Sequence, residues 1–336
     1  MEFFLHNQPR FGFDPSMEVF LGILESSPQL TVLSVANAGP RLRRVITTLP
    51  PAHRVIHLRN LEHLYLDQVY AFEVGWMLIH LDIPVSTKVR IYVDLDDGEP
   101  PTTPLDLAFE LQLALPDHPG FPHLTNLRRC TYMVDCQPYC VITAPNFAFK
   151  ITWNGSTRGH FDGLMMPFLR RAMGAGVIED LTVIHEQPSM YDDSTLEWDE
   201  IFGTLHSLRT LRVNQSPGRV DFSIWAAFQS PPSPALRVLH LSFLTFDEDP
   251  QGEGGGGNRK ELARRLVDYC AERNRRGCRL ERLVIEAPIN LPPGLPSLLA
   301  PHVGHFEVRE DILSDGDIRV PEFGSRLVFY SIQAVR

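Results

Sequence analysis

The sequence predicts an α/β fold in which short parallel strands and helices alternate along one repeating array. An apolar pattern of the form L-x-x-L-x-L, with aliphatic replacements, recurs along the chain, and stripes of apolar residues at helical spacing lie between its copies. Segments that alternate in this way build parallel sheets covered by helices. We therefore expect an α/β solenoid with parallel strands on its concave side and helices on its convex side.

The strand pattern occurs seven times, with middle residues at positions 33, 64, 91, 181, 211, 239 and 283. The steps between them are 31, 27, 90, 30, 28 and 44 residues, so the longest step equals three periods of 30. The copies are Leu30-Leu33-Val35, Leu61-Leu64-Leu66, Val89-Ile91-Val93, Ile178-Leu181-Val183, Leu208-Leu211-Val213, Leu236-Leu239-Leu241 and Leu280-Leu283-Ile285. A weaker copy is Val303-Phe306-Val308. Each copy is predicted to be a strand.

Apolar residues at i, i+3, i+4 and i+7 predict the helices between these strands. The stripes run over residues 17–24, 74–81, 165–172, 198–205 and 263–270. Asp14 and Pro15 are expected to begin the first helix as its N-cap and first helical residue, and Gly277 is expected to end the last.

The whole chain, residues 1–336, is expected to form a single array, with two interruptions. In residues 94–153 the apolar alternation at Cys130-Tyr132, Val141-Thr143 and Phe147-Phe149 predicts an irregular, hairpin-like region of paired strands. Residues 247–258 contain four consecutive glycines and are expected to form a flexible insertion.

Composition bounds the location and the partners. The formal net charge is -10, and of 31 basic residues only Lys88, Lys150 and Lys260 are lysines, which argues against a general nucleic-acid or membrane-surface binder. The start of the chain does not resemble a secretory signal, and the longest apolar window, 74–85, carries His80 and Asp82. Five cysteines form no repeating framework. We expect a cytoplasmic or nuclear protein with no membrane or nucleic-acid partner.

Between the inward leucines, alternate residues of each strand are expected to face the concave side of the array. Their mixture of polar, aromatic and arginine side chains is typical of a surface that binds protein. The candidate binding residues are Ser34, His63, Tyr65, Arg90, Tyr92, Thr182, Thr210, Arg212, His240 and Arg282. The alternative is that these residues are solvated strand faces without a partner.

No motif for catalysis or cofactor binding stands out. The sequence has no G-x-S-x-G, P-loop or H-E-x-x-H pattern, so no catalytic residue and no cofactor are expected. Cys130, Cys136 and Cys140, with His123 nearby, depart from the usual zinc spacing. The acidic run at 94–98 lacks the later ligands of a calcium loop. No metal site is expected.

Nine cationic residues lie between Arg259 and Arg282, where a phosphate-binding patch is conceivable. Pairs at i, i+4, such as Glu272 and Arg276, favour an exposed helix laced by ion pairs instead. The basic stretch is therefore assigned a structural role.

Two stretches carry a family resemblance. The segments SPQLTVLSV at 27–35 and LRNLEHLYL at 58–66 resemble leucine-rich repeats. Together with the irregular period and the strand at 89–93, they are similar to the substrate-receptor halves of fungal, basidiomycete-type F-box proteins. The resemblance covers the chain from about Asp14 onward and implies a leucine-rich-repeat solenoid that holds a substrate protein on its concave face.

In that family an F-box contacts a Skp-type adaptor of a cullin ubiquitin ligase. Because the first predicted helix follows Met1 almost at once, we expect the F-box to be absent, and contact with the adaptor would need an F-box upstream. The expected function is non-catalytic protein binding, as the substrate-recognition part of an F-box-type ubiquitin-ligase receptor. The alternative is an orphan structural or interaction repeat protein without ligase contact.

Overall fold

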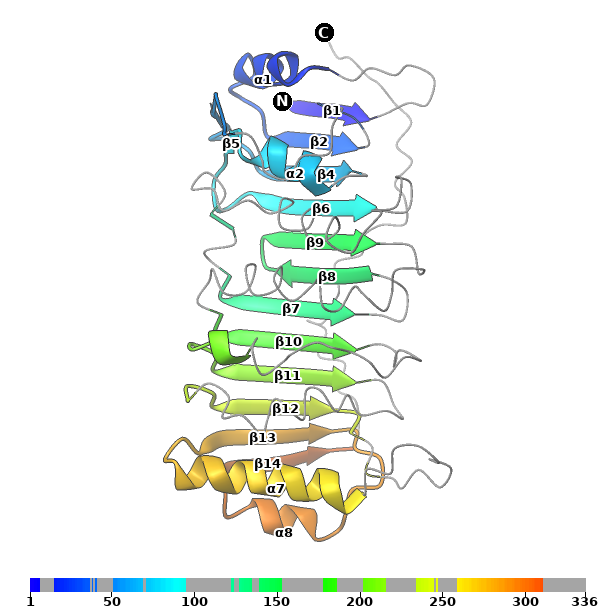
Figure 1. Cartoon of the computed structure of the whole chain (residues 1–336), viewed down its shortest axis with the longest axis vertical. Helices are drawn as coiled ribbons and strands as arrows, with labels where there is room; N and C mark the ends of the chain where they lie inside the picture. The colour runs from blue at the N-terminus through cyan, green and yellow to red at the C-terminus, as the bar shows by residue number, and fades with distance from the viewer. Residues whose placement is uncertain are drawn as a thin grey trace. The chain divides into compact units, whose positions relative to one another are not determined.

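The protein is mixed α/β and dominated by parallel strands (Figure 1). The computed structural model describes residues 1–6, 15–36, 38, 40, 51–68, 71–94, 122–123, 127–134, 139–152, 178–185, 202–215, 234–244, 246 and 259–310. The chain forms two compact units. Unit 1 comprises Met1–Asn126, Val141–Phe168 and Ser314–Arg336, and unit 2 comprises Leu127–Cys140 and Leu169–Leu313.

The main strands of unit 1 follow the order β1-β2-β4-β6-β9-β8. Their bounds are β1 (Glu2–His6), β2 (Val32–Ala36), β4 (His63–Gln68), β6 (Lys88–Asp94), β9 (Phe147–Thr152) and β8 (Tyr139–Ala144). Neighbours from β1 to β9 are parallel, whereas Figure 1 shows β8 running in the opposite direction beside β9. A second, two-stranded sheet pairs β3 (Ile56–His57) with β5 (Leu81–Asp82).

The repeated apolar pattern explains the register of unit 1. Leu33 on β2 lies opposite Leu64 on β4, and Leu64 lies opposite Val89 on β6. All three side chains are buried, as are those two residues further along each strand. A strand that buries one face needs its apolar residues level with those of its neighbour, because a slip of one residue would turn them to solvent. The strands predicted at these copies are confirmed.

Unit 2 repeats the same arrangement with the order β7-β10-β11-β12-β13-β14, all parallel. The bounds are β7 (Arg129–Val134), β10 (Asp180–His185), β11 (Thr210–Gln215), β12 (Val238–Ser242), β13 (Leu280–Glu286) and β14 (Val303–Arg309). Leu181, Leu211, Leu239 and Leu283 stand level on adjacent strands, and each is 0% exposed. These four copies, and the weaker copy on β14, are confirmed as strands.

Helices cover the apolar face of the strands. Their bounds are α1 (Met17–Glu25) and α2 (Ala71–Leu78) in unit 1, and α7 (Arg259–Arg275) and α8 (Leu295–Leu299) in unit 2. Helix α2 packs on β4, α7 on β13 and α8 on β14. The predicted stripe of α1 is buried throughout, as are Leu266 and Cys270 of α7. The stripe at 165–172 lies outside the described residues, and the one at 198–205 is described only from Phe202.

The predicted start of the first helix is wrong by two residues. Helix α1 begins at Met17, and its N-cap is Ser16 rather than Asp14. The Ser16 hydroxyl oxygen accepts a hydrogen bond from the backbone N–H of Val19 at 3.3 Å. A serine side chain satisfies this otherwise unpaired donor as well as an aspartate would.

The second helix also ends earlier than its apolar stripe suggests. Helix α2 stops at Leu78, because Leu81 enters β5 and pairs there with Ile56. An apolar spacing alone does not separate the last turn of a helix from the strand that follows. The predicted stop at Gly277 is confirmed: it lies two residues after α7 with a φ of 75°, a conformation that favours glycine.

Within the irregular region, the paired strands predicted around Cys130, Val141 and Phe147 are confirmed as β7, β8 and β9. Strand β1 was not predicted, although Phe3 and Leu5 alternate and lie level with Leu33 and Val35 of β2. The glycine-rich insertion at 247–258 lies outside the described residues. That the chain is a single array stays a prediction.

Gly304 on β14 tests how closely the strands of unit 2 approach. A Cβ atom at this position would lie 2.7 Å from the backbone oxygen of Glu281 on β13. We expect Gly304→Ala to lower the free energy of unfolding by about 1–3 kcal/mol, measured by denaturant titration, because backbone atoms must move apart.

The matched control is Gly203→Ala in the same unit, where a Cβ atom meets nothing within 4 Å. This variant should change the free energy of unfolding by less than about 0.5 kcal/mol. Equal effects of the two substitutions would contradict the close approach of β13 and β14.

Candidate functional site

In each unit, alternate strand residues point away from the buried apolar ladder. On β4, for example, Leu64 and Leu66 are buried, His63 is exposed and Tyr65 is half-exposed. We call these outward surfaces the unit 1 face and the unit 2 face. The unit 1 face contains Ser34, His63, Tyr65, Asp67, Lys88, Arg90, Tyr92 and Lys150. The unit 2 face contains Asp180, Thr182, Thr210, Arg212, His240, Ser242, Arg282, Glu286, His305, Glu307 and Arg309.

The unit 1 face is built from cross-strand rows. Tyr65 lies opposite Arg90, one row along from the pair of His63 and Lys88. On the other side Tyr92 lies level with Lys150 of β9. The result is a surface on which basic and aromatic side chains are direct neighbours.

Aromatic side chains on this face are held by polar contacts. The Tyr65 hydroxyl donates to a carboxylate oxygen of Asp67 at 3.3 Å, and the Tyr92 hydroxyl lies 3.4 Å from the Thr152 hydroxyl. Burial, and then the charge of Asp67, raise the pKa of Tyr65. The Lys150 ammonium lies 5.5 Å from the centre of the Tyr92 ring, within the range of a cation–π interaction. Tyr65 and Tyr92 are therefore anchored before any partner arrives.

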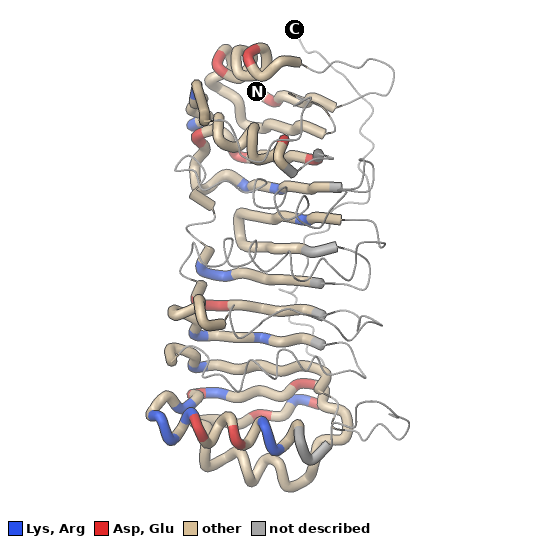
Figure 2. Tube along the Cα trace, in the orientation of Figure 1, with Lys and Arg blue, Asp and Glu red and all other residues tan. Residues whose placement is uncertain are grey.

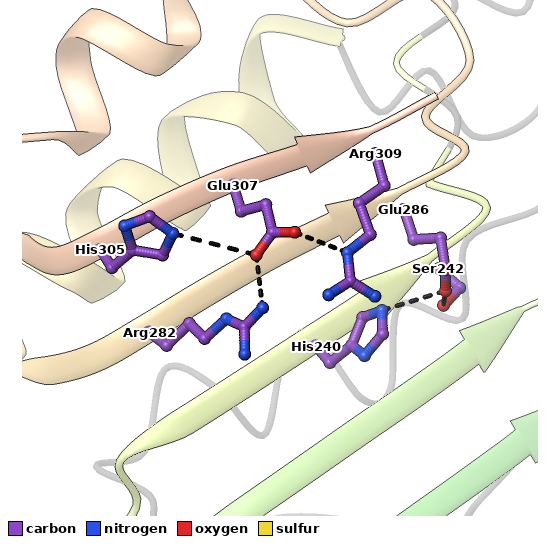
Figure 3. A network of polar contacts seen from close by, with 7 residues as sticks. All are labelled: His240, Ser242, Arg282, Glu286, His305, Glu307 and Arg309. Atoms are coloured by element: carbon purple, nitrogen blue, oxygen red, sulfur yellow. Dashed lines mark hydrogen bonds and ion pairs between the residues drawn. The ribbon is translucent and has the colours of Figure 1, made fainter. Parts of the chain in front are cut away.

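The unit 2 face contains more charge, and its charges are paired. Arg212 on β11 lies level with His240 on β12, and its Nη1 atom lies 3.4 Å from a carboxylate oxygen of Asp180. The remaining charges gather on β12, β13 and β14, where Figure 3 shows them pointing toward one another.

Glu286 is the first centre of this network. One of its carboxylate oxygens lies 3.0 Å from Nε2 of His240 and accepts a hydrogen bond from the Ser242 hydroxyl, also at 3.0 Å (Figure 3). Burial lowers the pKa of His240; Glu286 opposes this shift, while Arg309 and Arg212 add to it. In the neutral ring the proton that faces Glu286 must lie on Nε2.

Glu307 is the second centre. It accepts hydrogen bonds from Arg282 at 2.5 Å and from Nε of Arg309 at 2.7 Å, and Nε2 of His305 lies 3.9 Å away (Figure 3). The bonds from the two guanidinium groups lower the pKa of the Glu307 carboxyl to about 2. The carboxylate is therefore ionised at any physiological pH, and it neutralises part of the charge of both arginines.

All ten predicted binding residues lie on these two faces. Ser34, His63, Tyr65, Arg90 and Tyr92 belong to the unit 1 face, and Thr182, Thr210, Arg212, His240 and Arg282 belong to the unit 2 face. Ser34 and Thr182 are each only 6% exposed, and His6 contributes to the cover of Ser34 through a contact of 3.0 Å. A partner would reach the other eight more readily.

The sequence interpretation missed the carboxylates that organise the unit 2 face. Ser242 and Glu286 continue the outward alternation two residues beyond His240 and Val284. Glu307 is an outward position of the weaker copy at 303–308, and Arg309, the residue that follows this copy, is the next outward position. The same alternation applied to every copy could have found them. On the unit 1 face it would also have added Lys88, Asp67 and Lys150.

The cysteines and His123 do not form a metal centre in the part of the chain that the structure describes. Burial raises the pKa of the Cys130 and Cys270 thiols to about 12, which disfavours the thiolate that binds metal. Nε2 of His123 lies 2.9 Å from the backbone oxygen of Thr87. No cluster of three or more potential ligands occurs among the described residues, while the side chains of Cys136 and Cys140 lie outside them.

The basic stretch of α7 is held by contacts within unit 2. Glu272 contacts Arg276 at 2.5 Å, as the i, i+4 spacing predicts, and also Arg275 at 2.6 Å. Arg273 is buried and donates to the backbone oxygen of Leu236 at 2.8 Å. These contacts give Arg273, Arg275 and Arg276 a structural role.

Comparisons with known proteins add no family to these observations. A scan against protein-family models found no match, and searches of curated proteins and of solved structures found none either. Among the helices that the structure describes, none combines the length and apolar character needed to cross a membrane.

His240 should make the stability of unit 2 depend on pH. Because its pKa is lowered on folding, the unfolded chain binds a proton more readily, so acidification through the ordinary value of 6.5 should reduce the free energy of unfolding. We expect His240→Gln, which keeps a donor for Glu286, to flatten this loss in denaturant titrations made on both sides of that pH.

Ser242→Ala is the matched control, because it removes one hydrogen bond to Glu286 without removing a titrating group. It should lower stability by about 1–3 kcal/mol at every pH and leave the slope unchanged. If His240→Gln kept the full acid sensitivity of the wild-type protein, the assignment to His240 would be wrong.

Proposed function

We propose that this chain is a non-catalytic leucine-rich-repeat protein that binds another protein on its outward strand faces. The repeat architecture is an α/β solenoid, with the binding faces on its concave side. Each repeat contributes one strand, with buried apolar side chains on one face of the strand and outward side chains on the other.

The observation that carries the proposal is the ladder of leucine positions. Within unit 1 the copies at 33 and 64 stand in register, and within unit 2 so do those at 181, 211, 239 and 283. Helices pack on the same strands. Repeats of this kind bury their apolar face only by stacking on neighbouring repeats, and the other face of each strand is left for binding.

The composition of the faces supports a protein partner. Tyr65, Tyr92 and Arg90 lie side by side on the unit 1 face, and Arg212 and Arg282 lie on the unit 2 face. Tyrosine and arginine are the residues on which binding energy most often concentrates in protein interfaces. Two anchored tyrosines also lose little side-chain freedom on binding.

The specific form that the sequence resemblance favours is the substrate-recognition part of an F-box-type ubiquitin-ligase receptor. In this form the bound protein is the substrate, and contact with a Skp-type adaptor requires an F-box upstream. The competing form is an orphan repeat protein that binds or stabilises a partner without ligase contact. Recovery of a Skp-type adaptor with the chain and its natural upstream sequence would separate the two forms.

Photo-crosslinking tests the protein-binding proposal directly. A photoreactive phenylalanine analogue replaces Tyr65 or Arg212 in the chain, expressed in the cells that naturally contain it. We expect the same partner protein to be captured from both positions. As matched controls, the analogue replaces Val19 on α1 or Leu298 on α8, which are 48% and 59% exposed on helices, and these positions should not capture it.

The double variant Tyr65→Ala, Arg212→Ala should reduce capture of that partner by about tenfold, as the loss of interface hot spots does. Its melting temperature should fall by no more than a few degrees, because neither side chain belongs to the buried ladder. Unchanged capture, or equal capture from the helix positions, would contradict binding on the strand faces.

A further inference from the structure

The two faces differ in how their cations are paired. On the unit 2 face the carboxylates of Asp180 and Glu307 contact Arg212, Arg282 and Arg309. On the unit 1 face Lys88 and Arg90 form no ion pair with any residue that the structure describes. Both side chains are exposed.

Three cations of the unit 1 face lie in one place. Lys88 and Arg90 alternate on β6, and Lys150 lies on the neighbouring strand β9. Figure 2 shows basic segments on β6 and β9, and β6 ends at Asp94. Tyr65 stands level with Arg90, and Tyr92 follows it on the same strand. Two of the three lysines of the chain therefore belong to this patch.

Whether a cation already has an ion pair determines how much binding energy a partner's carboxylate gains from it. A carboxylate that approaches Arg282 competes with Glu307, which already holds this arginine at 2.5 Å. At Lys88 and Arg90 it displaces no carboxylate of the residues that the structure describes, so its attraction is not offset by the loss of such an ion pair. Each exposed pair is weak by itself, and several such pairs beside aromatic side chains are needed for useful affinity.

We propose that the unit 1 face binds an extended acidic segment of a protein partner. Two carboxylates placed two residues apart in the segment face Lys88 and Arg90, since this spacing is about 6.7 Å in any extended strand. An apolar or aromatic residue of the segment packs against Tyr65. This proposal rests on the protein-binding function proposed above and names the chemistry of the partner.

A nucleic acid fits the same patch less well. Asp67 lies on the face beside Tyr65, and the chain has a formal net charge of -10. Nucleic acids present a continuous row of phosphates and are bound by many cations together. A short acidic peptide carries only a few negative charges, and this patch has only a few cations, so the two match in number.

Fluorescence anisotropy with the full chain tests the proposal. The probe is a labelled peptide in which glutamate alternates with serine around one central tyrosine, and the comparison peptide has glutamine at each glutamate. We expect the glutamate peptide to bind about tenfold more tightly, with an affinity that falls as salt is added. A labelled single-stranded DNA of equal length should bind less tightly than the glutamate peptide.

The variant Lys88→Glu, Arg90→Glu should weaken binding of the glutamate peptide by at least about tenfold. The matched control is the charge reversal of two exposed arginines of unit 2, Arg209→Glu with Arg237→Glu, which changes the net charge equally and should leave binding unchanged. Melting curves of both variants check that they fold.

Equal binding of the two peptides, equal losses in the two variants, or tighter binding of the DNA would each overturn the acidic-segment proposal. The crosslinking experiment at Tyr65 separates this failure from that of the wider function. If Tyr65 captures a protein but the patch ignores acidic peptides, the choice of partner chemistry is wrong and protein binding stands. If Tyr65 and Arg212 capture nothing, the protein-binding function fails as well.

Discussion

The structure depends on the level stacking of aliphatic side chains between neighbouring parallel strands. Leu181, Leu211, Leu239 and Leu283 form such a row in unit 2, each fully buried against the next. A single copy would expose its leucines to solvent, so each strand is stable only when it is stacked between its neighbours. Replacing any member by alanine would leave a cavity of the kind that costs about 2–5 kcal/mol.

The same constraint determines what the protein can offer to a partner. Because strand side chains alternate, burying one set directs the other set to the opposite face. Outward positions are then free to vary in chemistry without disturbing the core. This freedom is visible in the two units, where similar ladders support a basic and aromatic face in one and a face of paired charges in the other.

The paired charges on the unit 2 face have a structural consequence. Glu286 is shared by His240 and Ser242, and Glu307 is shared by Arg282 and Arg309, so β12, β13 and β14 are joined by side chains as well as by backbone. His240 and Glu286 are only 15% and 10% exposed, and their contact is therefore screened less than a surface ion pair. On the unit 1 face Lys88 and Arg90 form no such carboxylate bridge with a described residue, and the aromatic groups are kept in place through hydroxyl contacts.

The strands at the apolar copies, the helices α1, α2 and α7 and the outward positions could be predicted from the sequence, because each follows from a local period of the chain. Leucine spacing located β4 and β11, and alternation from Leu64 and Leu211 identified Tyr65 and Arg212 as outward residues. Local periodicity does not specify which distant strands become neighbours. Only the tertiary structure placed β9 beside β6, added β1 next to β2, and brought His240 to Glu286 across 46 residues. These pairings depend on register and side-chain rotamers between segments far apart in the chain, which no local pattern encodes.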